Sequence, residues 1–133
     1  MSAVFADTYY FLGLSNRTDR AHAACARFSQ QYRGTIVTTW WVLVELADGL
    51  ATPPHRSRAA KLIQRVCSHP QFRVLPLSQS QLDRGFGLYT NRPDQEWSLT
   101  DCISFVVMTD EGLSEALTGD HHFEQAGFTL LLK

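Results

Sequence analysis

Two acidic residues stand directly behind short apolar segments. Asp7 follows Val4-Phe5-Ala6, and Asp120 follows Ala116-Leu117-Thr118 after a single glycine. Both segments are strand candidates, and ligands of open parallel sheets collect beyond the carboxyl ends of the strands. Either aspartate taken alone is better explained as a turn or N-cap residue. Together they mark one edge of a sheet as a place for chemistry.

Glu45 is unusual because its neighbours are apolar. Seven of the eight residues from Trp40 to Ala47 are hydrophobic, and a helix that is apolar on nearly every side is normally buried. A buried carboxylate has to be paired with a base, protonated or bound to a cation. Two structural explanations stay open: an ion pair with one of the ten arginines, or a side chain that emerges beside Asp48.

Asp101 follows Ser98 by three residues, which is the spacing of a helix capping box. The cap and the helix dipole alone make a carboxylate favourable in this first turn. The same turn points the carboxylate out of the helix N-terminus, toward the strand ends. A capping role and a chemical role are therefore compatible.

A small pocket that held Asp7, Glu45, Asp101 and Asp120 would carry a formal charge of -4 and would need counter-charge. All-oxygen ligation suits Mg²⁺ or Mn²⁺, with waters and substrate phosphates completing the octahedron. Such a site matches phosphodiester hydrolysis, in which one ion lowers the pKa of an attacking water and a second stabilises the leaving oxygen.

The elements that must position these acids alternate along the chain. Strands are predicted at 4–7, 35–38, 72–77, 115–118 and 129–132, and helices at 19–32, 39–47 and 55–69, followed by one capped by Ser78 and one capped by Ser98. Strands that alternate with helices imply βαβ crossovers. We expect a three-layer α/β/α domain with a central, mostly parallel sheet, formed by residues 1–133 as one unit.

Composition narrows the class of protein. With 133 residues, 44% of them hydrophobic, the chain suits one core, and a net charge of -1 excludes a strongly basic or acidic polymer-like protein. No segment approaches the roughly 18 apolar residues of a membrane span, and no basic leader opens the chain. Three cysteines without a C-x-x-C pair favour reduced thiols. We expect a soluble protein of the cytoplasm.

Charge outside the four acids favours an anionic partner. Without them 9 acids face 12 bases, which leaves a formal +3, and ten of the bases are arginine. Arg58, Lys61 and Arg65 would share one helix face, as would Arg20 and Arg27. A solvated helix face explains each stripe by itself.

Two other protein classes with this topology, one a phosphatase and one a signalling domain, are disfavoured. An aspartate-nucleophile phosphatase needs a second aspartate two residues after the first, where this chain has Tyr9. A receiver domain needs a lysine at a late strand end, and the two lysines are Lys61, on a predicted helix, and Lys133 at the terminus.

At the level of motifs the chain resembles the PIN-domain nucleases, and among them the VapC-type ribonuclease toxins of toxin–antitoxin pairs. The resemblance spans nearly the whole chain and rests on four segments: Val4-Phe5-Ala6-Asp7-Thr8, Thr38-Thr39 with Val42-Leu43 and Glu45-Leu46, Ser98-Leu99-Thr100-Asp101-Cys102 with Ser104-Phe105, and Leu117-Thr118-Gly119-Asp120-His121-His122-Phe123 with Ala126-Gly127-Phe128. The family's acidic tetrad falls on the four acids already singled out.

This resemblance implies a parallel-sheet endoribonuclease that depends on Mg²⁺ or Mn²⁺, forms a homodimer and is inhibited by a cognate antitoxin. Its substrate would be an RNA such as tRNA or mRNA, cut to a 5′-phosphate and a 3′-hydroxyl. Asp7, Glu45 and Asp101 would hold the principal ion. Asp120 would act as a ligand of either ion or as a water-orienting base, with the hydroxyls of Thr8 and Thr118 nearby.

Some alternatives stay open at this stage. The chain could be a non-catalytic PIN module that binds RNA or a protein, or a PIN nuclease of RNA processing without an antitoxin. His121 and His122 flank Asp120 and suggest metal ligands, but adjacent side chains of an extended segment point to opposite faces, so both are not expected to bind one ion. Surface or RNA-facing positions are expected instead. Aromatic residues such as Tyr9, Tyr10 and Trp40 are assigned to core and dimer packing rather than to base stacking.

Overall fold

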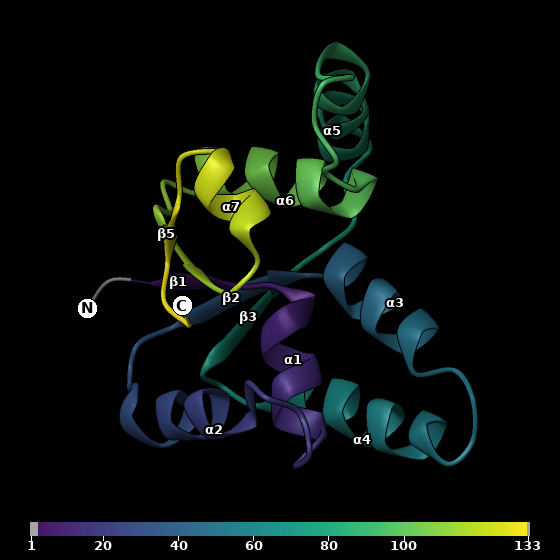
Figure 1. Ribbon diagram of the computed structural model, residues 1–133, viewed down its shortest axis with the longest axis vertical. Coiled ribbons are helices and arrows are strands. Elements are labelled where there is room, and N and C mark those ends of the chain that lie inside the picture. The colour runs from purple at the N-terminus through teal and green to yellow at the C-terminus, as the bar shows by residue number, and fades with distance from the viewer. Residues whose placement is uncertain (1–2, 133) are drawn as a thin grey trace.

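The computed structural model describes residues 3–132, which form a five-stranded sheet with helices on both faces (Figure 1). The strands lie in the order β3-β2-β1-β4-β5, and every pair of neighbours is parallel. Their bounds are β1 (Val4–Ala6), β2 (Ile36–Thr39), β3 (Phe72–Leu75), β4 (Glu115–Leu117) and β5 (Thr129–Leu130). The expected three-layer α/β/α architecture is confirmed.

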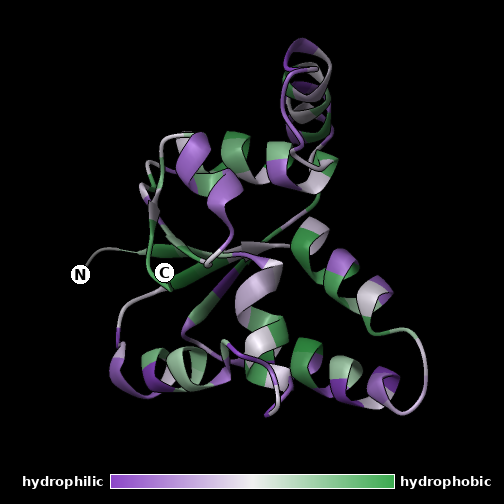
Figure 2. Cartoon of the chain, in the orientation of Figure 1, coloured by the Kyte–Doolittle hydropathy of each residue, from purple (hydrophilic) through white to green (hydrophobic). Residues whose placement is uncertain are grey.

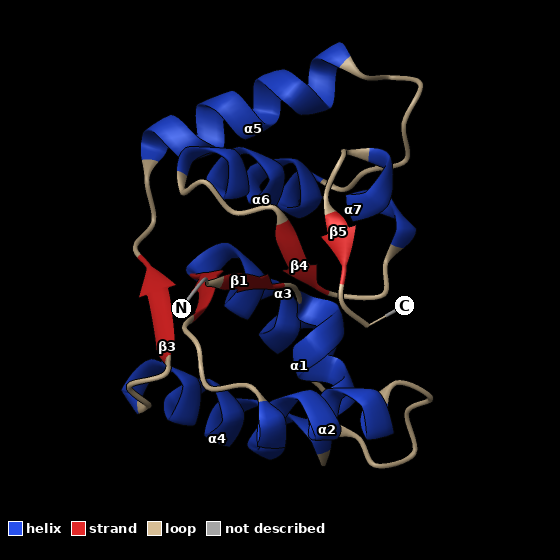
Figure 3. Cartoon of the chain, turned by 90° about the vertical axis from the view of Figure 1, so that its left-hand side faces the viewer, coloured by secondary structure: helices blue, strands red, loops and turns tan. Residues whose placement is uncertain are grey.

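Figures 1 and 3 show that the helices form two groups, one on each side of the sheet. The first group is α1 (Thr8–Ser15), α2 (His22–Gln31), α3 (Trp40–Gly49) and α4 (His55–Ser68), and the second is α5 (Gln79–Asn91), α6 (Leu99–Asp110) and α7 (His121–Gln125). The chain therefore changes face after β3, when it crosses to β4 on the far side of β1. This makes the β1/β4 edge the switch point of the sheet, where ligands of open α/β sheets bind.

The core forms around the central strands. All three residues of β1 and all four of β2 are buried, as continuous burial on both faces of a parallel sheet requires. Large side chains from the flanking helices complete the core, among them Tyr10, Phe11, Leu43 and Phe123, each at most 1% exposed. In Figure 2 hydrophobic colours dominate the strands, and hydrophilic residues gather on the helices and loops.

Two helices were not predicted, and one predicted helix begins later than expected. The segments at α1 and α7 carry no polar–apolar alternation that would reveal a helix, since α1 is apolar almost throughout and α7 has five residues. The second helix begins at His22 rather than Asp19, because the Asp19 carboxylate accepts the Ala21 N–H in the preceding turn. Arg20 therefore precedes the helix, and the Arg20–Arg27 stripe was wrong.

Helix α5 packs through a glycine and not through its aromatic residues. Gly85 is buried against Ile103 of α6, whereas the α5 aromatics Phe86 and Tyr89 are exposed. Figure 1 shows α5 projecting beyond α6 at the end of the molecule. No helix within residues 3–132 is long and apolar enough to cross a membrane.

Candidate active site

All four predicted acids line one pocket of about 450 Å³ beside the carboxyl ends of β1 and β4. The sequence separates them by up to 113 residues (Asp7 to Asp120), so it is the fold that brings them together. The lining residues are Asp7, Thr8, Tyr9, Leu12, Glu45, Gly49, Glu96, Ser98, Asp101, Asp120 and His122. The geometry thus places the predicted tetrad and Thr8 at a single site.

Three of the four carboxylates belong to the beginnings of helices. Asp7 is the N-cap residue of α1, Asp101 is the third residue of α6, and Asp120 is the N-cap residue of α7. Ser98 and Asp101 form the predicted capping box, with the Asp101 carboxylate accepting the Ser98 N–H at 3.1 Å. Asp120 accepts the His122 N–H at 3.0 Å. Helix N-termini favour negative charge, which is why acids are tolerated here.

Glu45 comes from α3, which is not buried on every side as its sequence suggested. Val42, Leu43 and Leu46 are buried, but Val44 and Trp40 are exposed, and Glu45 lies between these extremes. The helix begins at Thr39, whose hydroxyl accepts the Val42 N–H as predicted. Among the residues that the structure describes, Glu45 is neither paired with an arginine nor turned outward beside Asp48. Its side chain lines the pocket and accepts a hydrogen bond from the Thr8 hydroxyl.

Two threonine hydroxyls orient the acids. Thr8 Oγ1 donates to Glu45 Oε1 at 2.5 Å, which connects α1 to α3. Thr118 Oγ1 donates to Asp7 Oδ2 at 3.1 Å and accepts the Asp120 N–H at 3.0 Å. Thr118 therefore fixes one carboxylate and the backbone of the next, so β1 and β4 are held together at the site.

Burial makes the Asp7 carboxyl difficult to ionise. Desolvation, followed by the negative charge of Asp101, raises the pKa of Asp7 from 3.8 to about 7, although hydrogen bonds from Thr8 and Thr118 oppose the rise. Burial likewise raises the pKa of Asp101, against hydrogen bonds from Ser98 and His122 that lower it. The surroundings of Asp7 and Asp101 thus disfavour the ionised form of both carboxyl groups.

The pocket supplies no lysine or arginine side chain that would neutralise these acids. None of its lining residues is lysine or arginine, and within residues 3–132 no lysine or arginine forms an ion pair with any of the four. A set of carboxylate and hydroxyl oxygens without a cationic partner is the donor set of a hard divalent cation. The residues present therefore fit the predicted metal.

His122 was misplaced by sequence reasoning. Residues 121–125 are helical rather than extended, and the helix turns His122 into the pocket with its side chain 19% exposed, whereas His121 is 69% exposed. His122 Nδ1 lies 3.1 Å from Asp101 Oδ2 and 3.5 Å from Asp120 Oδ1. The histidine thus bridges the acids of α6 and α7, and the prediction of a surface position holds only for His121.

Tyr9, Glu96 and Gly119 also belong to the site; Tyr9 was assigned to core or dimer packing, and the other two were not singled out in the sequence. Tyr9 and Glu96 line the pocket. A Cβ atom on Gly119 would lie 2.6 Å from the Tyr9 ring, so only glycine leaves room for this tyrosine between β4 and α7. The close approach explains the glycine before Asp120.

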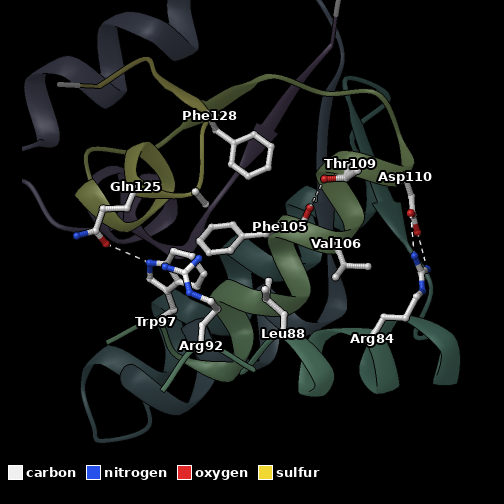
Figure 4. A pocket seen from close by; sticks show the side chains of 11 residues that line it. Arg84, Leu88, Arg92, Trp97, Phe105, Val106, Thr109, Asp110, Gln125 and Phe128 are labelled. Atoms are coloured by element: carbon white, nitrogen blue, oxygen red, sulfur yellow. Dashed lines mark hydrogen bonds and ion pairs between the residues drawn. The ribbon is translucent and has the colours of Figure 1, made fainter. Parts of the chain in front are cut away.

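A second pocket, of about 370 Å³, lies between α5, α6 and the segment after α7 (Figure 4). Its arginines are already partnered. Arg84 donates to both oxygens of Asp110 at 2.9 and 2.6 Å, and Arg92 lies over the Trp97 ring and pairs with Asp94. Its walls are largely apolar, including Leu88 and Phe128, and none of the four acids reaches it. This pocket is therefore separate from the acidic pocket at the switch point.

The fold agrees with a comparison to known families. The family model of the PIN domain matches residues 4–129, and the chain belongs to this family. The expected resemblance to VapC-type PIN nucleases is confirmed.

The chain is 24% identical to the 23S rRNA-specific endonuclease VapC20 of Mycobacterium tuberculosis, over 94% of this chain and 95% of that protein. The crystal structure of Mycobacterium tuberculosis VapC20, described as a sarcin–ricin loop cleaving toxin, superposes with a TM-score of 0.87 at 23% identity, over 96% of this chain and 97% of that one.

Two further structures share the fold. VapBC2 from Rickettsia felis, bound to a DNA fragment from its promoter, gives a TM-score of 0.68 at 14% identity and covers 97% of both chains. FitAcB from Neisseria gonorrhoeae gives 0.67 at 16% identity, over 96% of this chain and 95% of that one.

Proposed function

We propose that this PIN-domain protein is a VapC-like endoribonuclease that hydrolyses RNA with Mg²⁺ or Mn²⁺ held by Asp7, Glu45, Asp101 and Asp120. One observation carries the proposal: four carboxylates from separate elements line one pocket whose lining includes no lysine or arginine. A divalent cation bound there supplies charge neutralisation, acidifies water and stabilises a phosphate leaving group.

The chain's own residues prepare the site for this chemistry. Thr118 and Ser98 hold the carboxylates of Asp7 and Asp101 through hydrogen bonds, so little reorganisation remains when the substrate arrives. Asp120 is the more accessible acid, with its side chain 30% exposed against 9% for Asp101. It is therefore the residue assigned to orient the attacking water and to accept its proton.

The expected partners follow from the surface and the relatives. Outside the four acids the formal charge is +3, which favours an RNA polyanion. Arg58, Lys61 and Arg65 line one basic depression, and exposed apolar residues such as Trp40 and Phe86 provide area for a homodimer. Because similar structures are VapBC2 and FitAcB, we also assign this chain a cognate antitoxin protein and a cytoplasmic location.

The decisive experiment measures RNA cleavage by the purified chain with Mn²⁺, with Mg²⁺ or with EDTA. Substrates are 23S rRNA, suggested by the VapC20 relative, together with tRNA and mRNA. We expect cleavage with either ion and none with EDTA. Asp7→Asn and Asp101→Asn should lower the rate at least about 100-fold. Asp83→Asn, an exposed acid on α5, is the matched control and should leave the rate unchanged.

The products distinguish the mechanism from its alternatives. Attack by water leaves a 5′-phosphate and a 3′-hydroxyl, whereas attack by the ribose leaves a 2′,3′-cyclic phosphate. Cyclic ends, or cleavage that ignores both EDTA and the Asp7 substitution, would reject the proposed chemistry. RNA binding without cleavage of any substrate would instead identify a non-catalytic PIN module.

A further inference from the structure

A cluster of nitrogen and oxygen donors lies at the rim of the acidic pocket. Asp120, His121 and His122 each offer one ligand atom, and these atoms all lie within 4.8 Å of one another. We propose that they form a Zn²⁺ site, distinct in donor chemistry from the all-carboxylate site, through which Zn²⁺ inhibits the nuclease. The inhibitory part of this inference rests on the proposed function.

The distances are close to those that a tetrahedral zinc ion needs. With Zn–N and Zn–O bonds of about 2.0–2.2 Å, neighbouring ligand atoms lie about 3.3–3.6 Å apart. Asp120 Oδ1 is 3.7 Å from His121 Nδ1 and 3.5 Å from His122 Nδ1. The cluster thus offers three protein ligands, and water would complete the tetrahedron. Small side-chain shifts are enough to close the site.

The fold brings the two imidazoles together. Asp120 caps α7, and the first two residues of that helix place the rings of His121 and His122 with their centroids 4.6 Å apart. The tight helical turn after Asp120 brings both Nδ1 atoms within 3.7 Å of its Oδ1, which an extended segment would not do. The exposed ring of His121 leaves an open route for an ion from solvent.

The donor set selects the ion. Imidazole nitrogen favours Zn²⁺ and related transition ions, whereas Mg²⁺ takes oxygen ligands and water. Asp7 and Glu45 contribute nothing to the zinc set, but Asp120 belongs to both sets. A zinc ion that holds Asp120 therefore withdraws the residue assigned to orient water, and Zn²⁺ lowers Mn²⁺-supported cleavage.

The experiment is a zinc titration of the full chain against a chromophoric chelator, without Mg²⁺ or Mn²⁺. It uses a Cys67→Ser background because the exposed Cys67 thiol is a competing zinc ligand. We expect His121→Ala and His122→Ala to weaken zinc binding at least about tenfold. His55→Ala is the matched control, an exposed histidine whose ring faces Arg58, and should bind zinc as the parent does. Equal zinc affinity in all four proteins would overturn the site.

Two further measurements separate this inference from the proposed function. Asp7→Asn should weaken Mn²⁺ binding while zinc affinity stays within about twofold, since Asp7 lies outside the zinc set. Loss of both Mn²⁺ and Zn²⁺ binding in Asp7→Asn would overturn a separate zinc site.

In the cleavage assay, each protein's rate with Zn²⁺ is divided by its own rate without Zn²⁺. His121→Ala should need about tenfold more Zn²⁺ for half inhibition, and an unchanged requirement would overturn inhibition through this cluster. A parent protein that binds Zn²⁺ but cleaves no RNA would refute the nuclease and leave the zinc site intact.

Discussion

Replacing Asp7 by Asn should stabilise the metal-free protein while it abolishes the nuclease. Asp7 is 4% exposed, and its pKa is raised from 3.8 to about 7, first by burial and then by Asp101. Each pKa unit corresponds to about 1.4 kcal/mol, so ionised Asp7 costs the folded state about 4 kcal/mol. Asparagine is nearly isosteric and keeps an oxygen to accept the Thr118 hydroxyl, so the substitution removes the charge with little loss of contact.

The pH dependence has a definite sign. Between pH 4 and pH 7 the folded state holds a proton on Asp7 that the unfolded chain has released, so the free energy of unfolding falls as pH rises. The loss is complete above pH 7. The free energy of unfolding of Asp7→Asn should therefore exceed that of the parent by about 4 kcal/mol at pH 8 and by less than about 1 kcal/mol at pH 4.

Urea unfolding followed by circular dichroism, in EDTA at pH 4, 6 and 8, measures this difference directly. For a chain of this size 4 kcal/mol also corresponds to a rise of roughly 10–15 °C in Tm at pH 8. Asp83→Asn, exposed on α5, controls for the change in net charge and should differ little from the parent. If the parent and Asp7→Asn keep the same stability difference from pH 4 to pH 8, the burial argument is refuted.

The remaining predictions concern the ion, the hydroxyls and the packing of α5. Mg²⁺ at about 100 times its Kd should stabilise the parent by about 2.7 kcal/mol at pH 8 but stabilise Asp7→Asn far less, which melting curves with Mg²⁺ and EDTA will show. Thr8→Val removes the hydroxyl that donates to Glu45 and should weaken Mn²⁺ binding about tenfold, measured by calorimetry. Thr8→Ser keeps a hydroxyl and should bind Mn²⁺ as the parent does. Gly85→Ala would place a Cβ 2.5 Å from Ile103 Cγ1 and should cost about 1–3 kcal/mol in urea unfolding. Gly87→Ala, with nothing within 4 Å, should instead stabilise α5 by about 0.5–1 kcal/mol, and equal effects at both glycines would contradict the packing described.

The acids could be found from sequence because each depends on local signals. Asp7 and Asp120 follow apolar strands, and Asp101 stands at capping-box spacing from Ser98, so strand ends and a helix start define their positions without tertiary information. The parallel sheet follows from the alternation of strands and helices, and it places strand ends on one edge. The convergence of these acids was thus accessible from a single chain.

What was missed depends on packing between segments distant in sequence. The apolar run of α1 gives no helical periodicity, and its conformation follows from contacts with α2 and α3. His122 was misplaced because a five-residue helix leaves no pattern that separates it from an extended turn. Likewise, α3 was predicted to be buried because its residues are almost all apolar, but Trp40 and Val44 are exposed.

Three of the acids lie at helix N-termini, but the helix dipole stabilises a carboxylate by less than the cost of ionising Asp7. A helix dipole stabilises a nearby carboxylate by about 0.3–1 kcal/mol and by about 2 kcal/mol in partly buried geometry. The cost of ionising Asp7 is about 4 kcal/mol even with the hydrogen bonds of Thr8 and Thr118 in place. Dipoles and hydroxyls therefore orient these acids without neutralising them. Burial fixes the carboxylates in position before an ion binds. Under the proposed function, the free energy of binding a divalent cation then offsets the stability that the metal-free protein loses through these buried charges.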